Sequence, residues 1–504
     1  MPVRVRPPAP IYCREFIVFT ILHISDLHRS KKEPVDNDTL IAALLADRER
    51  YAVETPSIPK PDAIVVSGDL IQGAPIGMSD WQKEMQNQYI VAEDFLDKLA
   101  KRFVDGDRSK VLIIPGNHDV CWNTSFNSME RVPEDDKYPE KVRPLLLQAD
   151  SDLRWDWSKR ALYRIKDFNE YDRRLDSYWN FVTRFYDGVS LLTPIDPARG
   201  YQLFELCNRR IVVAAFDSNH VNDCFGFSGS IKRGTVARAS LAIKDLNWSY
   251  DLQVALWHHS INGPPLRDDY MEVSQIHEMA GLGFQLGMHG HQHVAEMATH
   301  SVYLSQVQSM KVISAGSLCA GALELPRGVN RQYNVLVIND DLRQAKLHVR
   351  ELVQGEQFSC KYGGAFMNGY TELEWEPRTN AIGYVIKSSE INERELILKA
   401  ESEFRSNRPV EALKLLKDIA VPADSHARQI ALQAAIATDD PKIIANIIHE
   451  PTSNDEAVYL AIAHIRVGKP ELAKRVLDAW PNIEVSIRRD IEARIKAAKI
   501  MGKK

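Results

Sequence analysis

Hydrophobic and polar positions in the first third of the chain alternate between short β-branched runs and longer helical patterns. Apolar runs predict buried strands at 16–22, 63–66 and 111–114, and helical spacing at 39–50 and 89–103 predicts the helices between them. Strands separated by crossover helices indicate βαβ units and a parallel or mixed sheet. In such sheets, functional residues gather beyond the carboxyl ends of the strands.

More strand patterns follow in the middle of the chain. They lie at 201–206, 211–216, 252–257, 284–288, 301–304, 312–314, 333–338 and 346–352. Together with the first three strands they predict a second sheet or a two-layered sandwich, with helices between the strands.

Residues 123–200 interrupt this rhythm. The segment opens with turn-rich, charged sequence and then becomes aromatic with helical spacing, and its many basic residues are nearly balanced by acidic ones. Two interpretations remain open. The segment is either a helical insertion that packs its aromatic side chains on the core, or a cap whose Arg, Trp and Tyr side chains grip a phosphate and a base.

The strand pattern ends near residue 352. Residues 353–390 are rich in Gly and polar residues and are expected to form a domain tail and a linker, whereas 391–504 is expected to be all-helical. Three similar helix starts, at Pro409, Pro441 and Pro470, lie 32 and 29 residues apart. This spacing is near the tetratricopeptide period of about 34 residues. The region is therefore either a tetratricopeptide-like repeat, expected to bind a protein partner or to self-associate, or an ordinary helical bundle.

Composition narrows these expectations. The 504 residues exceed one typical domain, and a net charge of −5 gives no strong field toward nucleic acid or anionic lipid. The longest apolar stretch is too short for a membrane span, and residues 1–15, which lack a signal-peptide core, are expected to form a loose arm. Six scattered cysteines without a CxxC pair favour reduced thiols and a cytoplasmic location.

Metal-binding residue types follow the predicted strands in five short blocks. These blocks are Asp26-x-His28, Gly68-Asp69, Gly116-Asn117-His118-Asp119, His258 and Gly290-His291-Gln292-His293. Asp26 and His28 stand two apart, so an extended segment projects them to the same side. Asp69 at the next strand end is placed to bridge two cations, and Asn117 offers a neutral oxygen. Two divalent metal ions suit phosphate-ester hydrolysis, because they acidify water and neutralise the attacking and leaving oxygens.

The order D-x-H, GD, GNH[DE], H and GHxH resembles the calcineurin-like metallophosphoesterases, and the resemblance covers a catalytic domain at about 16–352 that contains the 123–200 insertion. It implies an α/β fold, a two-layered mixed β-sheet sandwich flanked by helices. It also implies two divalent metal ions (Mn, Fe or Zn), a phosphoester substrate and a nucleophilic hydroxide that bridges the metals.

The resemblance also implies roles for individual residues. One metal ion would be held by Asp26, His28, Asp69 and His293. The other would be held by Asp69, Asn117, His258 and His291. His118 would not ligate, but would stabilise the transition state or protonate the leaving oxygen as a general acid.

Five further residues lie near these blocks in the sequence. His259 is expected outside the ligand set, either supporting it or packing. Asp119 either orients an imidazole or caps a helix. Arg29 either touches the substrate phosphate or is solvated. His23 and His289 are expected in the core.

Departures from subfamily patterns bear on the substrate. Residues 70–73 read Leu-Ile-Gln-Gly, which lacks the GDxVDRG continuation of serine/threonine phosphatases and has Gln72 at the tyrosine position of purple acid phosphatases. The remaining pattern is similar to class III cyclic-nucleotide phosphodiesterases and to Mre11/SbcD exonucleases. Three functions stay open: an esterase for a nucleotide or another small phosphoester, a DNA or RNA nuclease whose insertion guides a strand, and an interaction module with regulated catalysis.

Overall fold

A computed structural model gives the fold of the chain. It describes residues 18–30, 35–133, 151–261, 269–303, 307–321, 324–353, 355–376, 396–397, 399–404, 408–416, 426–448, 451 and 453–501. The chain divides into two compact units, one of residues 1–298 and 310–379 and the other of residues 299–309 and 380–504. The arm expected at 1–15 and the end of the expected linker, 377–390, lie outside the described residues.

The first sheet is built around β1 (Phe19–Ile24). Its strand order is β15-β14-β13-β1-β2-β3, with β16 paired to β14. The other members are β2 (Ala63–Val66), β3 (Val111–Ile113), β13 (Gln332–Ile338), β14 (Gln344–Val353), β15 (Gln357–Cys360) and β16 (Thr371–Glu374). Strands β1, β2 and β3 run parallel, whereas β13 runs antiparallel to β1, so the sheet is mixed.

Strands β15 and β16 lie where the sequence pattern indicates a domain tail and linker. Only two residues of β15, Phe358 and Cys360, are buried, and β16 buries Leu373 alone. Such short alternation is too weak a periodic signal to predict a strand from sequence. Residues 357–374 therefore extend the first sheet.

The second sheet has the order β11-β12-β10-β9-β8-β7. Its strands are β7 (Tyr201–Leu206), β8 (Ile211–Phe216), β9 (Leu252–Leu256), β10 (Leu286–His289), β11 (Met297–Tyr303) and β12 (Val307–Ser314). Strands β8, β9, β10 and β12 run parallel, and β7 runs antiparallel to β8. The carboxyl ends of β9 and β10 carry two of the five ligand blocks.

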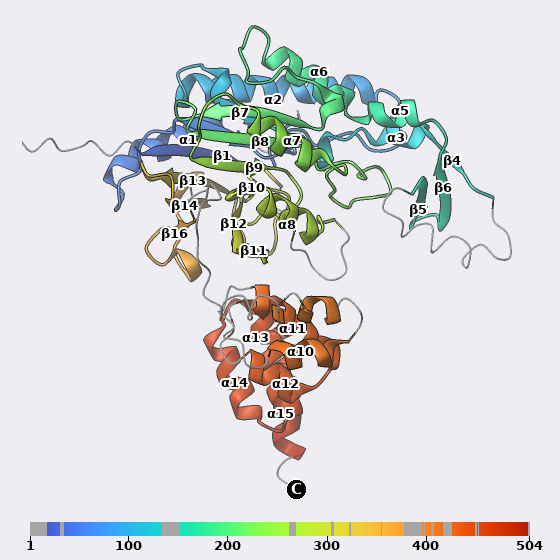
Figure 1. Cartoon of the computed structure of the whole chain (residues 1–504), viewed down its shortest axis with the longest axis vertical. Coiled ribbons are helices and arrows are strands. Elements are labelled where there is room, and N and C mark those ends of the chain that lie inside the picture. Colours follow the sequence, from blue (N-terminus) through green and yellow to red (C-terminus); the bar gives the residue numbers. More distant parts are fainter. Residues whose placement is uncertain are drawn as a thin grey trace, which may run out of the picture. The chain divides into compact units, whose positions relative to one another are not determined.

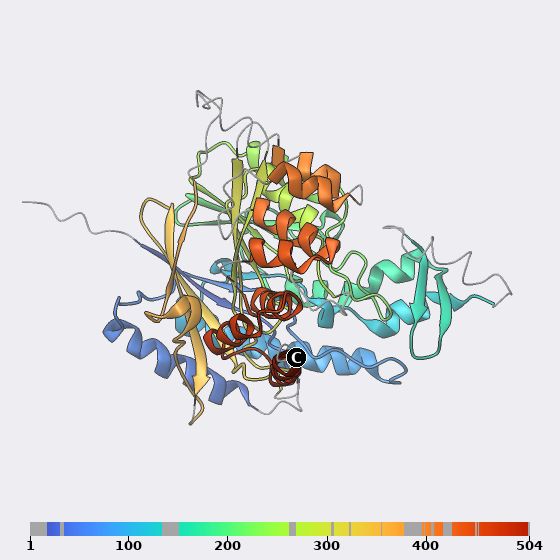
Figure 2. The same cartoon turned by 90° about the horizontal axis from the view of Figure 1, so that it is seen from below.

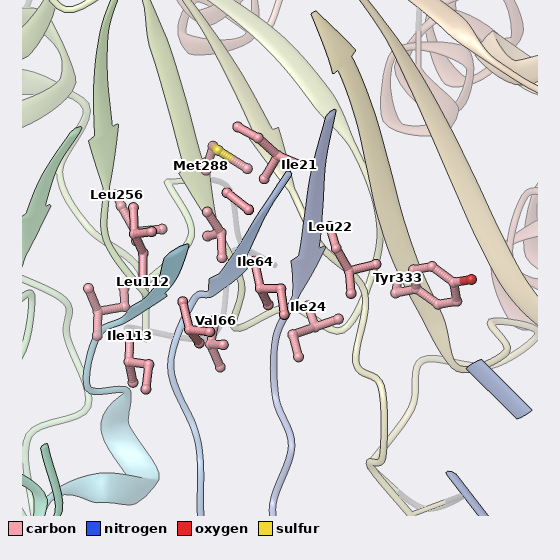
Figure 3. Close-up of a cluster of buried hydrophobic side chains, with 14 of the residues drawn as sticks. Ile21, Leu22, Ile24, Ile64, Val66, Leu112, Ile113, Leu256, Met288 and Tyr333 are labelled. Atoms are coloured by element: carbon pink, nitrogen blue, oxygen red, sulfur yellow. The ribbon is translucent and has the colours of Figure 1, made fainter. Parts of the chain in front are cut away.

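Side chains from both sheets form one core, in which Ile64 and Val66 of the first sheet share a buried cluster with Leu256 and Met288 of the second (Figure 3). Helices α1 (Asn37–Arg50) and α2 (Trp81–Phe103), both labelled in Figure 1, pack on each other. Helix α2 also contacts β2. Helix α7 (Thr235–Lys244) contacts β7 and β8, and α8 (Val273–Gly281) precedes β10. The expected two-layered α/β sandwich flanked by helices is confirmed.

The 123–200 segment is only partly helical. Its helices are α3 (Trp122–Asn127), α5 (Phe168–Asp172) and α6 (Asp176–Phe185), but between them β4 (Met129–Arg131), β5 (Leu153–Asp156) and β6 (Ala161–Ile165) form an antiparallel sheet. This small sheet lies away from both main sheets in two perpendicular views (Figure 2). The strands differ from the helical expectation because aromatic residues such as Trp155 and Tyr163 suit a short ladder as well as a helix. Residues 134–150 lie outside the described part.

Aromatic side chains of α6 pack as the core interpretation of this segment expects. Tyr178, Phe181 and Phe185 are buried, and Phe181 stacks on Tyr89 of α2. Trp157, in the turn between β5 and β6, is instead 81% exposed. The helical part of the segment therefore packs in the core, as the first interpretation expects, whereas the cap interpretation stays a prediction.

The second unit is helical in the described part of residues 396–501, whereas the described residues of its short segment 299–309 belong to β11 and β12. Its helices are α10 (Pro409–Leu416), α11 (His426–Thr438), α12 (Pro441–Ile447), α13 (Asn454–Arg466), α14 (Pro470–Ala479) and α15 (Val485–Met501). Pro409, Pro441 and Pro470 each open a helix, where a missing backbone N–H costs no hydrogen bond. Each helix from α10 to α15 packs on its successor.

The structure bears on two expectations from composition, those on membrane spans and on cysteines. Among the described residues, no helix combines the length and hydropathy that crossing a membrane requires. The described cysteines are free thiols and are Cys121, Cys207, Cys224, Cys319 and Cys360.

Candidate metal centre

Five strand ends from the two sheets meet at one place in the first unit. Asp26 and His28 follow β1, and Asp69 follows β2. Backbone hydrogen bonds tie these loops together, from the Asp26 N–H to the Gly68 carbonyl at 3.1 Å and from the His28 N–H to the Asp69 carbonyl at 2.9 Å. The blocks after β3, β9 and β10 complete the group, and the Gly290 N–H donates to the His258 carbonyl at 3.1 Å.

One cluster of donor atoms comes from Asp26, His28 and His293. Nε2 of His28 and Nε2 of His293 are 3.3 Å apart. Nε2 of His293 also lies 3.3 Å from Oδ1 of Asp26. Oδ2 of Asp26 accepts the backbone N–H of His291 at 3.1 Å, so that Oδ1 is the oxygen that faces the cluster.

A second cluster comes from Asn117, His258 and His291. Oδ1 of Asn117 lies 2.9 Å from Nε2 of His258 and 2.9 Å from Nδ1 of His291, and these two nitrogens are 3.3 Å apart. Oδ2 of Asp69 lies 3.3 Å from Nε2 of His258 and 4.0 Å from Nε2 of His28. Asp69 therefore stands between the two clusters.

Backbone carbonyls fix which ring nitrogen faces the clusters. Nδ1 of His258 lies 2.7 Å from the Ser67 carbonyl, and Nδ1 of His293 lies 2.9 Å from the Glu324 carbonyl. Because a carbonyl accepts only an N–H, Nδ1 of each ring carries a proton, and Nε2 is the nitrogen that a metal ion would meet. These tautomers follow from the hydrogen-bond partners.

The backbone is strained at these same residues. Five of them have φ between 44° and 78°, in the left-handed region that residues with a Cβ rarely adopt. They are Asp26, His28, Asp69, His291 and His293. Each such residue costs of order 1 kcal/mol or more, and such strain concentrates at functional sites. Five strained residues in one group indicate that the fold holds this geometry at the expense of stability.

Glycines beside the ligand residues allow the loops to approach. A Cβ on Gly116 would overlap Asp69, and one on Gly290 would overlap Ser25 and lie 2.8 Å from Oδ2 of Asp26. The glycines of the GNHD and GHxH blocks are therefore required by close packing against the first two loops.

The donor set fits divalent metal ions. In each cluster two imidazole nitrogens lie 3.3 Å apart, and Oδ1 of Asp26 accepts no hydrogen bond of normal geometry among the described residues. Imidazole nitrogens with carboxylate and amide oxygens are ligands for Mn, Fe and Zn. The carboxylate of Asp69, between the clusters, is placed to serve an ion in each.

Carboxylates and imidazoles in the group shift one another's pKa. Burial alone would lower the pKa of His258 and His293, but Asp69 and Asp26 respectively raise both to about 9. Burial would raise the pKa of Asp26 and Asp69, yet the facing imidazoles hold both below their ordinary values. A bound cation would replace the protons that His258 and His293 otherwise hold.

His118 is adjacent to the clusters and is held differently from the other histidines. Its Nδ1 lies 2.9 Å from the Gln72 carbonyl, and its ring packs edge-on against His28 with centroids 4.6 Å apart. Its backbone N–H donates to Oδ1 of Asp69 at 2.8 Å. A ligand atom of His118 lies within 4.8 Å of those of His28 and Asp69, so proximity alone does not separate it from the ligands.

The profile of the calcineurin-like phosphoesterase family matches residues 19–295. The chain belongs to this family. No curated protein sequence matches it.

Solved structures with some likeness to this phosphoesterase have low sequence identity to it. A 5′-nucleotidase from Candida albicans is 14% identical with a TM-score of 0.31, and the match covers 68% of this chain and 54% of the nucleotidase. Calcineurin-like phosphoesterase YfkN from Bacillus subtilis is 12% identical with a TM-score of 0.27, covering 79% of this chain and 99% of the other. A Vps29 variant from Entamoeba histolytica is 9% identical with a TM-score of 0.23, covering 68% and 97%.

Two residues named from the sequence of this phosphoesterase have clear places beside the centre. The buried carboxylate of Asp119 accepts hydrogen bonds from the backbone N–H groups of Gly116 and Leu70 and from the hydroxyl of Tyr89. Asp119 therefore holds this turn in place instead of orienting an imidazole. Burial and then the nearby Asp69 raise its pKa to about 7. Arg29 is buried, with Nη2 donating to the Val35 carbonyl and to Asn37.

The other three histidines named from the sequence, which are His23, His259 and His289, are buried beside the centre. Nδ1 of His259 lies 2.8 Å from the Ser218 hydroxyl, so this ring supports the neighbouring loop. Nε2 of His23 lies 2.9 Å from the Ser67 hydroxyl, and His289 stacks on Trp257.

Four residues that contact the site were not among the site residues named from the sequence. Ser218 follows β8, and its place at a strand end was a usable signal. Gln72, Asp269 and Glu324 had none, because their contacts arise only from the tertiary approach of distant loops. Oδ2 of Asp269 lies 3.7 Å from Nε2 of His291, and Nε2 of Gln72 donates to Oε1 of Glu324 at 3.1 Å.

Proposed function

We propose that this phosphoesterase is a two-metal-dependent hydrolase of phosphodiester, or phosphomonoester, bonds in a nucleotide or a similar small phosphoester. The observation that carries the proposal is the convergence of imidazole nitrogens and carboxylate and amide oxygens in two clusters on either side of Asp69. One ion would be held by Asp26, His28, Asp69 and His293. The other would be held by Asp69, Asn117, His258 and His291.

When bound, the metal ions would acidify a water and offset the charge of the phosphate. The protein residues supply positioning. The Ser67 and Glu324 carbonyls orient the rings of His258 and His293, and the His118 backbone N–H holds Oδ1 of Asp69. Because these contacts exist before substrate arrives, little reorganisation is needed during reaction.

His118 is the proposed general acid. The hydrogen bond from Nδ1 to the Gln72 carbonyl sets the plane of the ring. Nε2 is then the nitrogen that can pass a proton to the leaving alkoxide or aryloxide oxygen. A positioned acid of this kind accelerates hydrolysis by about 10²–10⁴-fold.

We also propose that residues 391–504 form a tetratricopeptide-like repeat that binds a protein partner or a second copy of the chain. The support is the packing of each described helix from α10 to α15 on its successor, as in solenoid repeats. Light scattering of the full chain over a range of concentrations tests self-association. A mass that stays at one chain throughout contradicts that part.

The esterase proposal is tested with one substrate panel in Mn²⁺. The panel contains bis-p-nitrophenyl phosphate, p-nitrophenyl phosphate, cyclic nucleotides, and labelled single- and double-stranded DNA. We expect turnover of the small esters that chelation abolishes. No turnover of any phosphoester contradicts the proposal, and turnover of DNA alone supports the nuclease alternative instead.

A further inference from the structure

A hydrogen-bonded clasp joins two loops at the edge of the candidate metal centre. Gln72 lies three residues after Asp69, and Glu324 lies in the turn that follows β12. Nε2 of Gln72 donates to Oε1 of Glu324 at 3.1 Å, and the Gly321 N–H donates to Oε2 at 2.9 Å. Both oxygens of an exposed carboxylate are thereby oriented.

The backbone of the same two residues holds two site histidines. The Glu324 carbonyl accepts from Nδ1 of His293, and the Gln72 carbonyl accepts from Nδ1 of His118, each at 2.9 Å. The carboxylate of Glu324 is close enough to His28 and His118 for their charges to act on it. It therefore lies on the side of the centre where His118 would meet the leaving group.

The charge of this carboxylate is not cancelled locally. Its hydrogen-bond donors are a neutral amide and a backbone N–H, and in the described part of the chain no Lys or Arg pairs with it. A second carboxylate, that of Asp269, lies 3.7 Å from His291 in the other cluster. The surroundings of the centre thus add negative charge beyond that of the proposed ligands.

We infer that Glu324 is a specificity-determining residue that favours neutral or cationic leaving groups and disfavours leaving groups with a further negative charge. The inference rests on the proposed function, in which His118 faces the leaving oxygen. A fixed carboxylate near that oxygen repels a second phosphate or a carboxylate on the departing alcohol, because like charges a few ångströms apart still repel at the effective dielectric constant of a protein surface. Substrates would then be small esters with one phosphate, and nucleic acid strands would be poor substrates.

Two diesters that differ in the charge of the leaving group test the effect of the Glu324 carboxylate. Methyl 4-nitrophenyl phosphate and methyl 3-carboxy-4-nitrophenyl phosphate release similar chromophores and differ by one negative charge on the leaving group. The ratio of their kcat/KM values is measured with the full-length Mn²⁺-loaded protein and with Glu324→Gln, which keeps an amide oxygen for Gln72. Glu205→Gln, an exposed residue on β7, serves as the control.

We expect the wild-type protein to prefer the neutral leaving group, and Glu324→Gln to reduce that preference about fivefold at low ionic strength. The change should shrink in 0.5 M NaCl, because salt screens exposed charges. Glu205→Gln should leave the ratio as it is in the wild type. An unchanged ratio in Glu324→Gln, or an equal loss on both esters together with lost metal, overturns the inference. No turnover of either ester by the wild-type protein overturns the proposed function instead.

Discussion

The candidate metal centre places strained residues and close-packed glycines side by side. Asp26, His28 and Asp69 adopt left-handed backbone conformations, and Gly116 and Gly290 pack without room for a Cβ. Each feature lowers stability or limits substitution, and each fixes where a donor atom points. The site therefore holds its donor atoms in fixed positions at the cost of a strained backbone.

A methyl group at position 290 tests that placement. A Cβ on Gly290 would overlap Ser25 and crowd Oδ2 of Asp26, so Gly290→Ala should displace the Asp26 carboxylate and weaken Mn²⁺ binding by about tenfold or more. Isothermal titration calorimetry measures the affinity. Gly321→Ala is the matched control, because its Cβ would meet only Glu324, at an ordinary 3.6 Å. Equal affinities in the two variants would count against the close-packing argument.

Individual strands and helices were predictable where their periodicity was long. The apolar runs at 201–206 and 211–216 coincide with β7 and β8, and the helix predicted at 39–50 is α1 with two more residues at its start. The small sheet of β4, β5 and β6 and the late strand β15 were missed, because strands of three to five residues carry too few periods to be distinguished from loops or helices.

The residues of the site also divide into those that could be predicted from the sequence and those that could not. The five blocks with the proposed ligands could be found from sequence because each directly follows a predicted strand, and all five meet in the structure. The clasp of Gln72 and Glu324 could not, because its partners are 252 residues apart and sit in loops without a pattern. Sequence locates the strand ends, but only the tertiary fold brings the loops between them together.

Strand β14 carries a titratable group that makes stability depend on pH. His348 is buried against Tyr370, and burial, followed by repulsion from Arg350, lowers its pKa to about 4. In the unfolded chain the pKa of an imidazole is near 6.5, so below that pH the unfolded state binds a proton that the folded state does not bind. The contribution of His348 to the free energy of unfolding is therefore present above pH 6.5 and is lost as the pH falls toward 4. Between pH 7 and pH 5 the free energy of unfolding falls by about 2 kcal/mol on this account.

The contribution of His348 is measured by urea unfolding at pH 7 and pH 5. His348→Phe keeps a ring against Tyr370 without a titrating proton, so its unfolding free energy should fall by about 2 kcal/mol less than that of the wild type over this interval. The same fall in both proteins would show that His348 does not carry the effect.

The first unit as a whole is required to build the centre. Its proposed ligands come from loops that follow β1, β2, β3, β9 and β10, in two different sheets. The ligand set can therefore form only when both sheets are in place, and metal binding is coupled to the folding of this unit.

Metal removal should consequently lower thermal stability. Mn²⁺ at about 100 times its dissociation constant adds about 2.7 kcal/mol to the folded state, which corresponds to a rise in Tm of roughly 5 °C. Differential scanning calorimetry with Mn²⁺ and with a chelator measures it. Asp69→Asn should show a much smaller shift, because it weakens the ligand shared by both clusters. A full shift in Asp69→Asn would place the stabilising ions elsewhere.

The central claim is that one set of residues holds two metal ions and a separate residue, His118, transfers the proton. It is tested most directly by counting bound Mn²⁺ and measuring turnover of bis-p-nitrophenyl phosphate on the same preparations of wild type, Asp69→Asn and His118→Gln. We expect two ions per wild-type chain, joint loss of ions and activity in Asp69→Asn, and retention of both ions with about 100-fold slower turnover in His118→Gln. Loss of an ion from His118→Gln, or full activity in Asp69→Asn, would contradict the account.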